Sequence, residues 1–186
     1  MKVKLGKYPD YNEETQIEPE REIEVKIDKW DVWNLDHTLA LIIAPSLKLL
    51  KKQKHGAPCV DNKDVPKKLR MSKKAKKKYN TDGSTDKKFF KRYDYVLDEM
   101  IWAFEQHASA DDEEQFHTGE HDMLWIPVDA EGDEVPEDKV DDFQMYRMTL
   151  GPNDTHVFDK KGHAAHWKRK ENGLRLFAKY YFSLQD

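Results

Sequence analysis

The chain of 186 residues lacks most features that would place it in a specialised class of proteins. Its single cysteine, Cys59, excludes an internal disulfide and a zinc site built from cysteine pairs. No apolar run approaches the length that spans a bilayer, and the opening MKVKLGKYPD lacks the apolar core of a signal peptide. These absences predict a soluble protein of one domain in a reducing cytoplasm.

Common catalytic signatures are also missing, because the sequence has no P-loop, no G-x-G-x-x-G fingerprint and no G-x-S-x-G motif. Charged residues, in contrast, make up 37% of the chain, although the formal net charge is only −4. They are segregated along the sequence. Residues 67–78 (KKLRMSKKAKKK) are basic, whereas residues 129–142 (DAEGDEVPEDKVDD) are mainly acidic. We therefore expect two poles of opposite charge.

Hydrophobic periodicity predicts three main helices, over residues 36–54, 86–107 and 162–184. Asn34 or Asp36 would cap the first helix, Gly56 would end it, and Pro45 would kink or split it. An apolar stripe expected on the last helix consists of Trp167, Leu174, Phe177, Tyr181 and Leu184.

Strands are predicted at 22–27, where charged and apolar residues alternate, and at 123–128 and 143–150. The last two would form a hairpin or join the first strand. Residues 62–88 hold the lysine run and a polar NTDGSTD stretch, which favours a flexible basic insertion between the first two helices. The predicted fold is therefore α+β, with three main helices packed against a small antiparallel sheet in a single domain, 1–186.

His37 and His55 are the first candidates for a binding site. They are eighteen residues apart in the sequence, and an unbroken helix would separate them by ~27 Å, so one metal ion could not bind both. We therefore favour a structural interpretation in which Asp36 caps the helix. His37 would still be available to acidic residues of another helix.

An acidic stripe on the second helix is the next candidate. Asp94, Asp98 and Glu105 fall on one side at the edge of the apolar arc, where carboxylates need either a metal ion or basic partners. No second helix carries an E-x-x-H or E-x-x-E pattern of the kind that carboxylate-bridged metal sites use. We therefore favour ion pairs, with partners drawn from Lys91, Arg169 and Arg175.

The segment FHTGEHD brings His117 and His121 to a spacing of four residues, but Gly119 between them argues against a helix. His121 and Asp122 form an H-D pair of the sort found in metal-dependent phosphohydrolases, although such a pair is common by chance.

His166, Trp167 and Lys170 share one stripe of the last helix with His163. Aromatic and cationic groups placed in this way could hold a nucleotide by stacking and charge. The simpler interpretation, which we favour, is an amphipathic helix whose first turns border the core.

Four ordered segments span most of the chain: WNLDHTLALII, KHGAPCVDNKDVP, FKRYDYVLDEMIWAFE and KRKENGLRLFAKYY. Together they resemble a family of uncharacterised proteins of tailed bacteriophages. The resemblance implies a viral protein working in the cytoplasm of a bacterial host, with the lysine-rich stretch as a variable insertion. It identifies no catalytic residue.

These observations favour an accessory protein that binds a host protein, a nucleic acid or a nucleotide, without a cofactor and without a membrane partner. Five tryptophans offer anchors for such a contact. The alternative is a metal-dependent phosphohydrolase or nuclease, in which a divalent cation held by carboxylates and His37 activates water. A minor virion component is a third interpretation. The sequence gives no oligomeric state.

Overall fold

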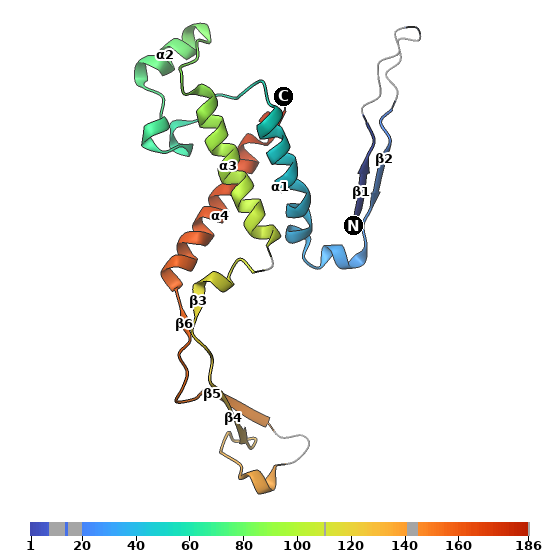
Figure 1. The fold of residues 1–186 in the computed structure, drawn as a ribbon, viewed down its shortest axis with the longest axis vertical. Helices are drawn as coiled ribbons and strands as arrows, with labels where there is room; N and C mark the ends of the chain where they lie inside the picture. Colours follow the sequence, from blue (N-terminus) through green and yellow to red (C-terminus); the bar gives the residue numbers. More distant parts are fainter. Residues whose placement is uncertain (8–13, 15–19, 110, 141–144, 186) are drawn as a thin grey trace. The chain divides into compact units, whose positions relative to one another are not determined.

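The computed structural model describes residues 1–7, 14, 20–109, 111–140 and 145–185. Their contacts divide the chain into two compact units, one formed by Met1–Ala110 with Lys168–Asp186 and the other by Asp111–Trp167. The predicted α+β class is confirmed, with helices and short antiparallel strand pairs (Figure 1). No helix in the described part of the chain is long and apolar enough to cross a membrane.

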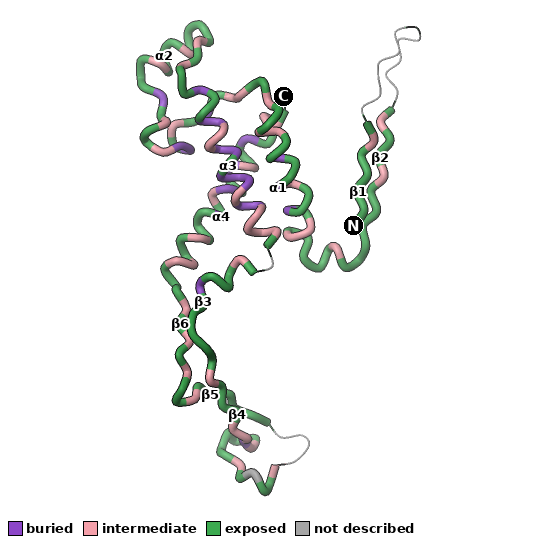
Figure 2. Tube along the Cα trace, in the orientation of Figure 1, coloured by how far each residue is buried: buried purple, intermediate pink, exposed green. Residues whose placement is uncertain are grey.

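The core of the first unit lies between α1 (Leu35–Gln53), α3 (Phe89–Ala108) and the part of α4 (Lys160–Tyr180) that begins at Lys168. Figure 2 shows the buried residues gathered along α3 and on the sides of α1 and α4 that face it. All three helices were predicted from the spacing of their apolar residues. The buried core cluster consists of Ala40, Ala44, Leu47, Val60, Val65, Tyr93, Val96, Leu97, Met100, Ile101, Phe104, Leu176 and Tyr180.

Helix α3 also buries two charged side chains, each with a partner of opposite charge. Arg92 is fully buried, and its guanidinium donates to both carboxylate oxygens of Asp86, at 2.6 and 3.2 Å, and to the carbonyl of Leu69 at 3.1 Å. The Glu99 carboxylate accepts two hydrogen bonds from the guanidinium of Arg169 in α4, at 2.9 and 3.1 Å. Burial of these charges is tolerated because each has a partner of opposite charge and hydrogen bonds that replace most of those of water, although Nε of Arg92 has no partner among the described residues.

The contact between α3 and α4 is close enough to require glycine at position 173. A Cβ atom at Gly173 would collide with the Cβ of Ala103 and lie 2.6 Å from the carbonyl oxygen of Glu99. Next to this point the rings of Phe104 and Phe177 meet edge to face, with centroids 4.9 Å apart. The close approach shifts the buried side of α4 away from the predicted stripe. Its buried residues are Lys170, Gly173, Leu176 and Tyr180, whereas Trp167, Leu174 and Tyr181 of the predicted stripe are exposed.

The ends of α1 differ from the prediction. Asn34 occupies the N-cap position, but its side chain makes no capping hydrogen bond, and Asp36 lies inside the first turn. Asp36 is therefore not a cap. Its negative charge instead interacts favourably with the positive end of the helix dipole. The helix ends at Gln53 with Lys54 as its C-cap, before Gly56. Of the two effects expected of Pro45, the split does not occur, since α1 is continuous, while the kink stays a prediction. Pro45 and Leu41 are both exposed, so water can hydrate the Leu41 carbonyl that proline leaves without a donor.

The lysine-rich segment contains a fourth helix, α2 (Lys73–Asp82), after two short 3-10 turns, η2 (Asn62–Asp64) and η3 (Lys67–Leu69). Ser72 caps α2 by accepting a hydrogen bond from the Ala75 amide, and Gly83 ends it in the left-handed conformation. Sequence periodicity missed this helix because it is almost wholly polar. The flexibility expected for residues 62–88 stays a prediction, as does the single-domain organisation.

Three separate two-stranded antiparallel sheets complete the described structure. The strand predicted at 22–27 is β2 (Ile23–Lys26), which pairs with an unpredicted strand, β1 (Lys2–Leu5). The predicted strands near 123–128 and 143–150 are β4 (Met123–Val128) and β5 (Met145–Leu150), which form a hairpin rather than joining β2; residues 143 and 144 lie outside the described part. The third sheet joins β3 (His117–Thr118) to β6 (Val157–Phe158).

The close approach of α3 and α4 gives the first testable prediction. Gly173→Ala should lower the free energy of unfolding by about 1–3 kcal/mol, because the added methyl group overpacks the interface by more than its gain in helix propensity. Urea denaturation measures the difference. Gly56→Ala is the matched control, since nothing lies within 4 Å of its added Cβ, and its stability should change by less than about 0.5 kcal/mol. Equal midpoints for Gly173→Ala and the unmodified protein would contradict the close packing.

Candidate functional site

The acidic stripe of α3 is neutralised by lysines of α1. Lys48 pairs with Glu105, Lys51 with Asp98 and Lys54 with Asp94, each with an amine-to-carboxylate distance of 2.5 Å. The residue numbers of the lysines rise as those of their acidic partners fall, so the two helices run antiparallel along this row of ion pairs. The predicted ion pairing is therefore confirmed, but its partners are different.

The basic residues expected to neutralise this stripe have other roles. Arg169 binds Glu99 and lies over the ring of Trp102, 3.9 Å from its centroid, while Arg175 pairs with Asp64 at 2.8 Å. The sequence located the stripe correctly and missed its partners. The signal that could have identified these partners is the spacing of Lys48, Lys51 and Lys54, because residues three apart lie on one side of a helix and can face an acidic stripe.

The two histidines at the ends of α1 are not brought together. Nδ1 of His37 lies 3.0 Å from the carbonyl oxygen of His107 near the end of α3, and His55 is exposed just beyond the last residue of α1. Among the described residues, no three or more His, Cys, Asp or Glu side chains are arranged to hold a metal ion.

Histidines do gather in the second unit, where His156 joins the pair noted in the sequence. Nδ1 of His117 lies 2.8 Å from Nε2 of His156, and the rings of His121 and His156 stack with centroids 3.7 Å apart. The β3–β6 pairing brings the two segments together. Gly119, at φ +75°, lies between His117 and His121 and packs directly against the carbonyl of Thr155. A side chain at position 119 would block this close contact.

The pKa of His156 is lowered by its surroundings. Partial burial and the neighbouring charges of His121 and His117 lower the pKa of His156, while Asp154 opposes them. Asp154 accepts hydrogen bonds from His121 at 3.2 Å and from the Asp122 amide at 3.1 Å. The contact between His117 and His156 requires one nitrogen to donate and the other to accept, so both rings cannot be doubly protonated. His156 carries no motif of its own, which is why the sequence did not identify it.

The residues of the stripe expected on the last helix differ in exposure and contacts, and nucleotide binding by them stays a prediction. The side chain of His166 is only 8% exposed, lies 3.4 Å from Asp112 and packs edge-on against Phe116. Trp167 donates its indole N–H to His163 at 2.9 Å. Lys170 is buried in the first unit. The simpler interpretation of these residues, as the border of a packed helix, fits this geometry better.

The basic segment presents a dense, accessible positive charge. All eight cationic side chains of residues 67–78 are exposed, five of them on α2, and within the described residues none makes an ion pair. Tyr79 and Phe89, with ring centroids 5.9 Å apart, pack α2 against the start of α3. The cationic residues are Lys67, Lys68, Arg70, Lys73, Lys74, Lys76, Lys77 and Lys78.

Hydrogen bonds fix the base of this segment to itself and to α3. The Asn62 amide group donates to the carbonyl of Met71 at 2.8 Å and accepts from its N–H at 2.7 Å, which closes residues 62–71 into a compact loop. Lys88 donates to the carbonyl of Lys68 at 2.7 Å, and Arg92 binds that of Leu69. The side chains of Val65 and Met71 are buried beneath the loop.

Asp64 joins the same segment to α4. Its side chain is fully buried, accepts a 2.8 Å hydrogen bond from the Tyr180 hydroxyl and pairs with Lys179 and with Arg175. The Tyr180 oxygen also accepts from the Asp61 amide at 3.1 Å. Burial acts to raise the pKa of Asp64, but the hydrogen bonds from Lys179, Tyr180 and Arg175 outweigh it and hold that pKa below its usual range. Burial raises the pKa of Tyr180 to about 12, so the phenol stays a donor.

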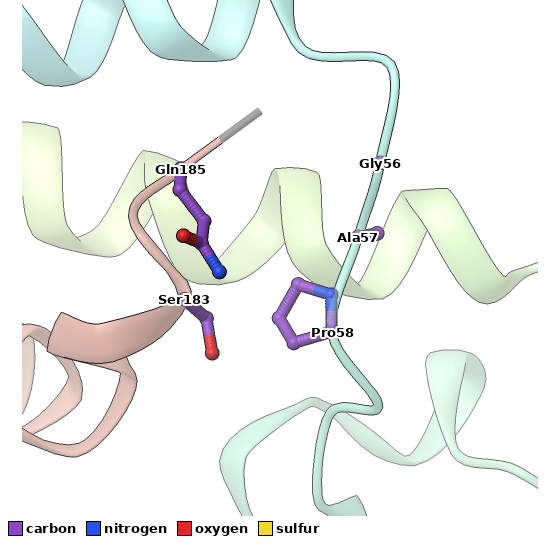
Figure 3. A pocket seen from close by; sticks show the side chains of 5 residues that line it. All are labelled: Gly56, Ala57, Pro58, Ser183 and Gln185. Carbon is purple, nitrogen blue, oxygen red and sulfur yellow. The ribbon is translucent and has the colours of Figure 1, made fainter.

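A hollow of about 330 Å³ lies between the chain leaving α1 and residues near the C-terminus (Figure 3). Figure 3 shows Ser183 and Gln185 on one side and Gly56, Ala57 and Pro58 on the other. None of these five described residues has a carboxylate, imidazole, thiol or amine side chain of the kind that acid–base catalysis uses.

Comparisons with known proteins give no further guide, since no family model, no curated protein and no solved structure matches this chain.

The network around Asp64 gives a prediction about pH. Asp64→Asn should lower the free energy of unfolding at pH 7 by about 2–3 kcal/mol, because Lys179 and Arg175 lose their shared anion. A carboxyl whose pKa is depressed in the folded state stabilises the protein above its unfolded pKa, and this contribution is lost as pH falls. The stability gap between the two proteins should therefore narrow below about pH 4. Urea denaturation from pH 7 to pH 3 measures it.

Asp36→Asn is the control, because Asp36 is exposed on the first turn of α1. Its stability should stay within about 1 kcal/mol of that of the unmodified protein across the same range, since a charge at an exposed helix end contributes no more than this. A constant gap for Asp64→Asn at every pH would show that Asp64 is not held as a charged group.

Proposed function

We propose that this protein binds the phosphate backbone of nucleic acid through the basic segment 67–78. The observation that carries the proposal is the exposure of eight cationic side chains, without acidic residues among them, on a loop and helix joined to the helical core by Asp64 and Arg92. A flexible lysine tail would supply positive charge without fixing the spacing of its amines. A supported helix supplies charge at fixed spacing, which suits a regular polyanion.

The chemistry of the segment favours binding without sequence preference. Residues 67–78 contain no aromatic side chain for base stacking and no Asn or Gln for reading base edges. Lysine amines suit phosphate oxygens as point charges. The negative net charge of the whole chain does not oppose this, because screening limits the reach of distant acidic residues to about 10 Å in ordinary salt.

The cellular setting proposed for this activity is the cytoplasm of a bacterium infected by a tailed phage, on the basis of the sequence resemblance. The protein would act there as an accessory factor. The pairing of Asp94, Asp98 and Glu105 with lysines of α1 favours this non-enzymatic role over hydrolysis at those carboxylates.

Fluorescence anisotropy with a labelled DNA duplex of arbitrary sequence tests the proposal. The unmodified protein should bind, and log K should fall linearly with log salt concentration, with a slope of about −0.9 for each phosphate contacted. Replacing Lys74, Lys77 and Lys78 by Gln should weaken binding by more than about tenfold at low salt and reduce the slope by up to about 3. An unrelated duplex should compete equally well.

The matched control removes three other exposed lysines, Lys160, Lys161 and Lys168, and so changes the net charge by the same amount. Its affinity should stay within about twofold of the unmodified protein if the charge of the basic segment, rather than total charge, drives binding. Equal losses in both variants, or no binding of duplex DNA or RNA by the unmodified protein at low salt, would overturn the proposal.

A further inference from the structure

The N-terminal hairpin of β1 and β2 has one charged face and one apolar face. Its register pairs Lys2 with Lys26, Val3 with Val25, Lys4 with Glu24 and Leu5 with Ile23. Because side chains alternate between the two faces of a strand, the apolar residues of both strands fall on one face. That face consists of Val3, Leu5, Ile23 and Val25, and Ile27 continues the alternation beyond β2.

The charged face is already satisfied within the hairpin. Glu24 pairs with Lys2 at 3.4 Å and with Lys26 at 3.1 Å, and Lys4 pairs with Glu22 at 3.4 Å. These contacts need only water on their outer side. The charged face therefore has no need of another surface.

The apolar face is left in water. Its side chains are 39–64% exposed, although no residue of β1 or β2 on that face is polar. Immediately after it, the short turn η1 (Lys29–Val32) and the residue that follows expose Trp30 at 67% and Trp33 at 79%, with their ring centroids 6.3 Å apart. A two-stranded hairpin is marginally stable by itself in water and normally needs its apolar face covered.

The exposed area of this face reaches the lower end of the range for specific protein interfaces. The five apolar hairpin residues expose roughly 500 Å², so two copies would bury about 1,000 Å² in total.

We propose that a second copy of this chain covers this face, in a two-fold symmetric dimer formed by two hairpins stacked face to face. A two-fold interface requires one self-complementary surface, and a flat apolar face without charge meets its own copy without repulsion. The two ribbons would stack about 10 Å apart, as in a sheet sandwich, and leave both charged faces in water. Lysines along the strands disfavour the other arrangement, edge-to-edge addition of strands.

The dimer is independent of nucleic-acid binding, since the hairpin shares no residue with the basic segment. Sedimentation equilibrium of the full chain, from low to high micromolar concentration, should show a reversible monomer–dimer equilibrium. Val25→Asp should raise the dissociation constant by more than about tenfold, because it buries two unpaired carboxylates at the centre of the contact. Circular dichroism of each variant confirms that the helices remain folded.

Phe182→Asp is the matched control, since Phe182 is 90% exposed and lies outside the hairpin. It should leave the dissociation constant unchanged. A protein that stays monomeric at all concentrations would overturn the proposal, and its hairpin face would then be a surface for a different protein. A dimer that Val25→Asp does not weaken, or that Phe182→Asp weakens equally, would also overturn it.

Cross-linking provides a second, positional test. In a Cys59→Ser background, Val25→Cys places a thiol near the two-fold axis, and a bis-maleimide that spans about 10 Å should produce a covalent dimer. Lys26→Cys places the thiol on the charged face of the same strand and should not cross-link. Equal cross-linking at both positions would contradict face-to-face stacking.

Discussion

The burial of α3 on several sides is the constraint on which the first unit depends. One side of α3 takes the apolar side chains of α1, another accepts α4 at the distance that Gly173 sets, and its first turn supports the loop above Val65 and Met71. A helix surrounded in this way cannot keep every side chain apolar, because its ends and edges meet polar backbone. The two charged side chains buried on α3 are neutralised by hydrogen-bonded partners, Arg92 by Asp86 and Glu99 by Arg169.

Much of this arrangement follows from sequence patterns, and the remainder does not for identifiable reasons. The long helices and the β4–β5 hairpin follow from the periodicity of their apolar residues, which is a local property. Helix α2 has no apolar stripe, and its position is marked only by Ser72 and Gly83 as caps. Strand β1 is too short to show alternation until its partner, β2, is known.

The candidate sites show the same division more sharply. Asp94, Asp98 and Glu105 could be recognised as one stripe, but their lysine partners depend on how two helices align. His156 gains its meaning only from the strand pairing that brings it beside His117 and His121. In each case the sequence reveals which groups need a partner, while packing over long sequence separations decides which partner they find. Asp36 shows the limit of local residue preferences. Aspartate is favoured at N-caps, but Asn34, two residues earlier, occupies the N-cap position of α1.

The attachment of Asp61 and Asp64 to Tyr180 and Lys179 has a consequence for the order of assembly. These contacts join residues more than a hundred positions apart, at separations of 115 to 119 along the chain. Contacts of such long range form late, since loop closure opposes them until the intervening chain has collapsed. During synthesis the basic loop therefore leaves the ribosome well before α4, and its attachment to α4 cannot form until translation passes residue 180.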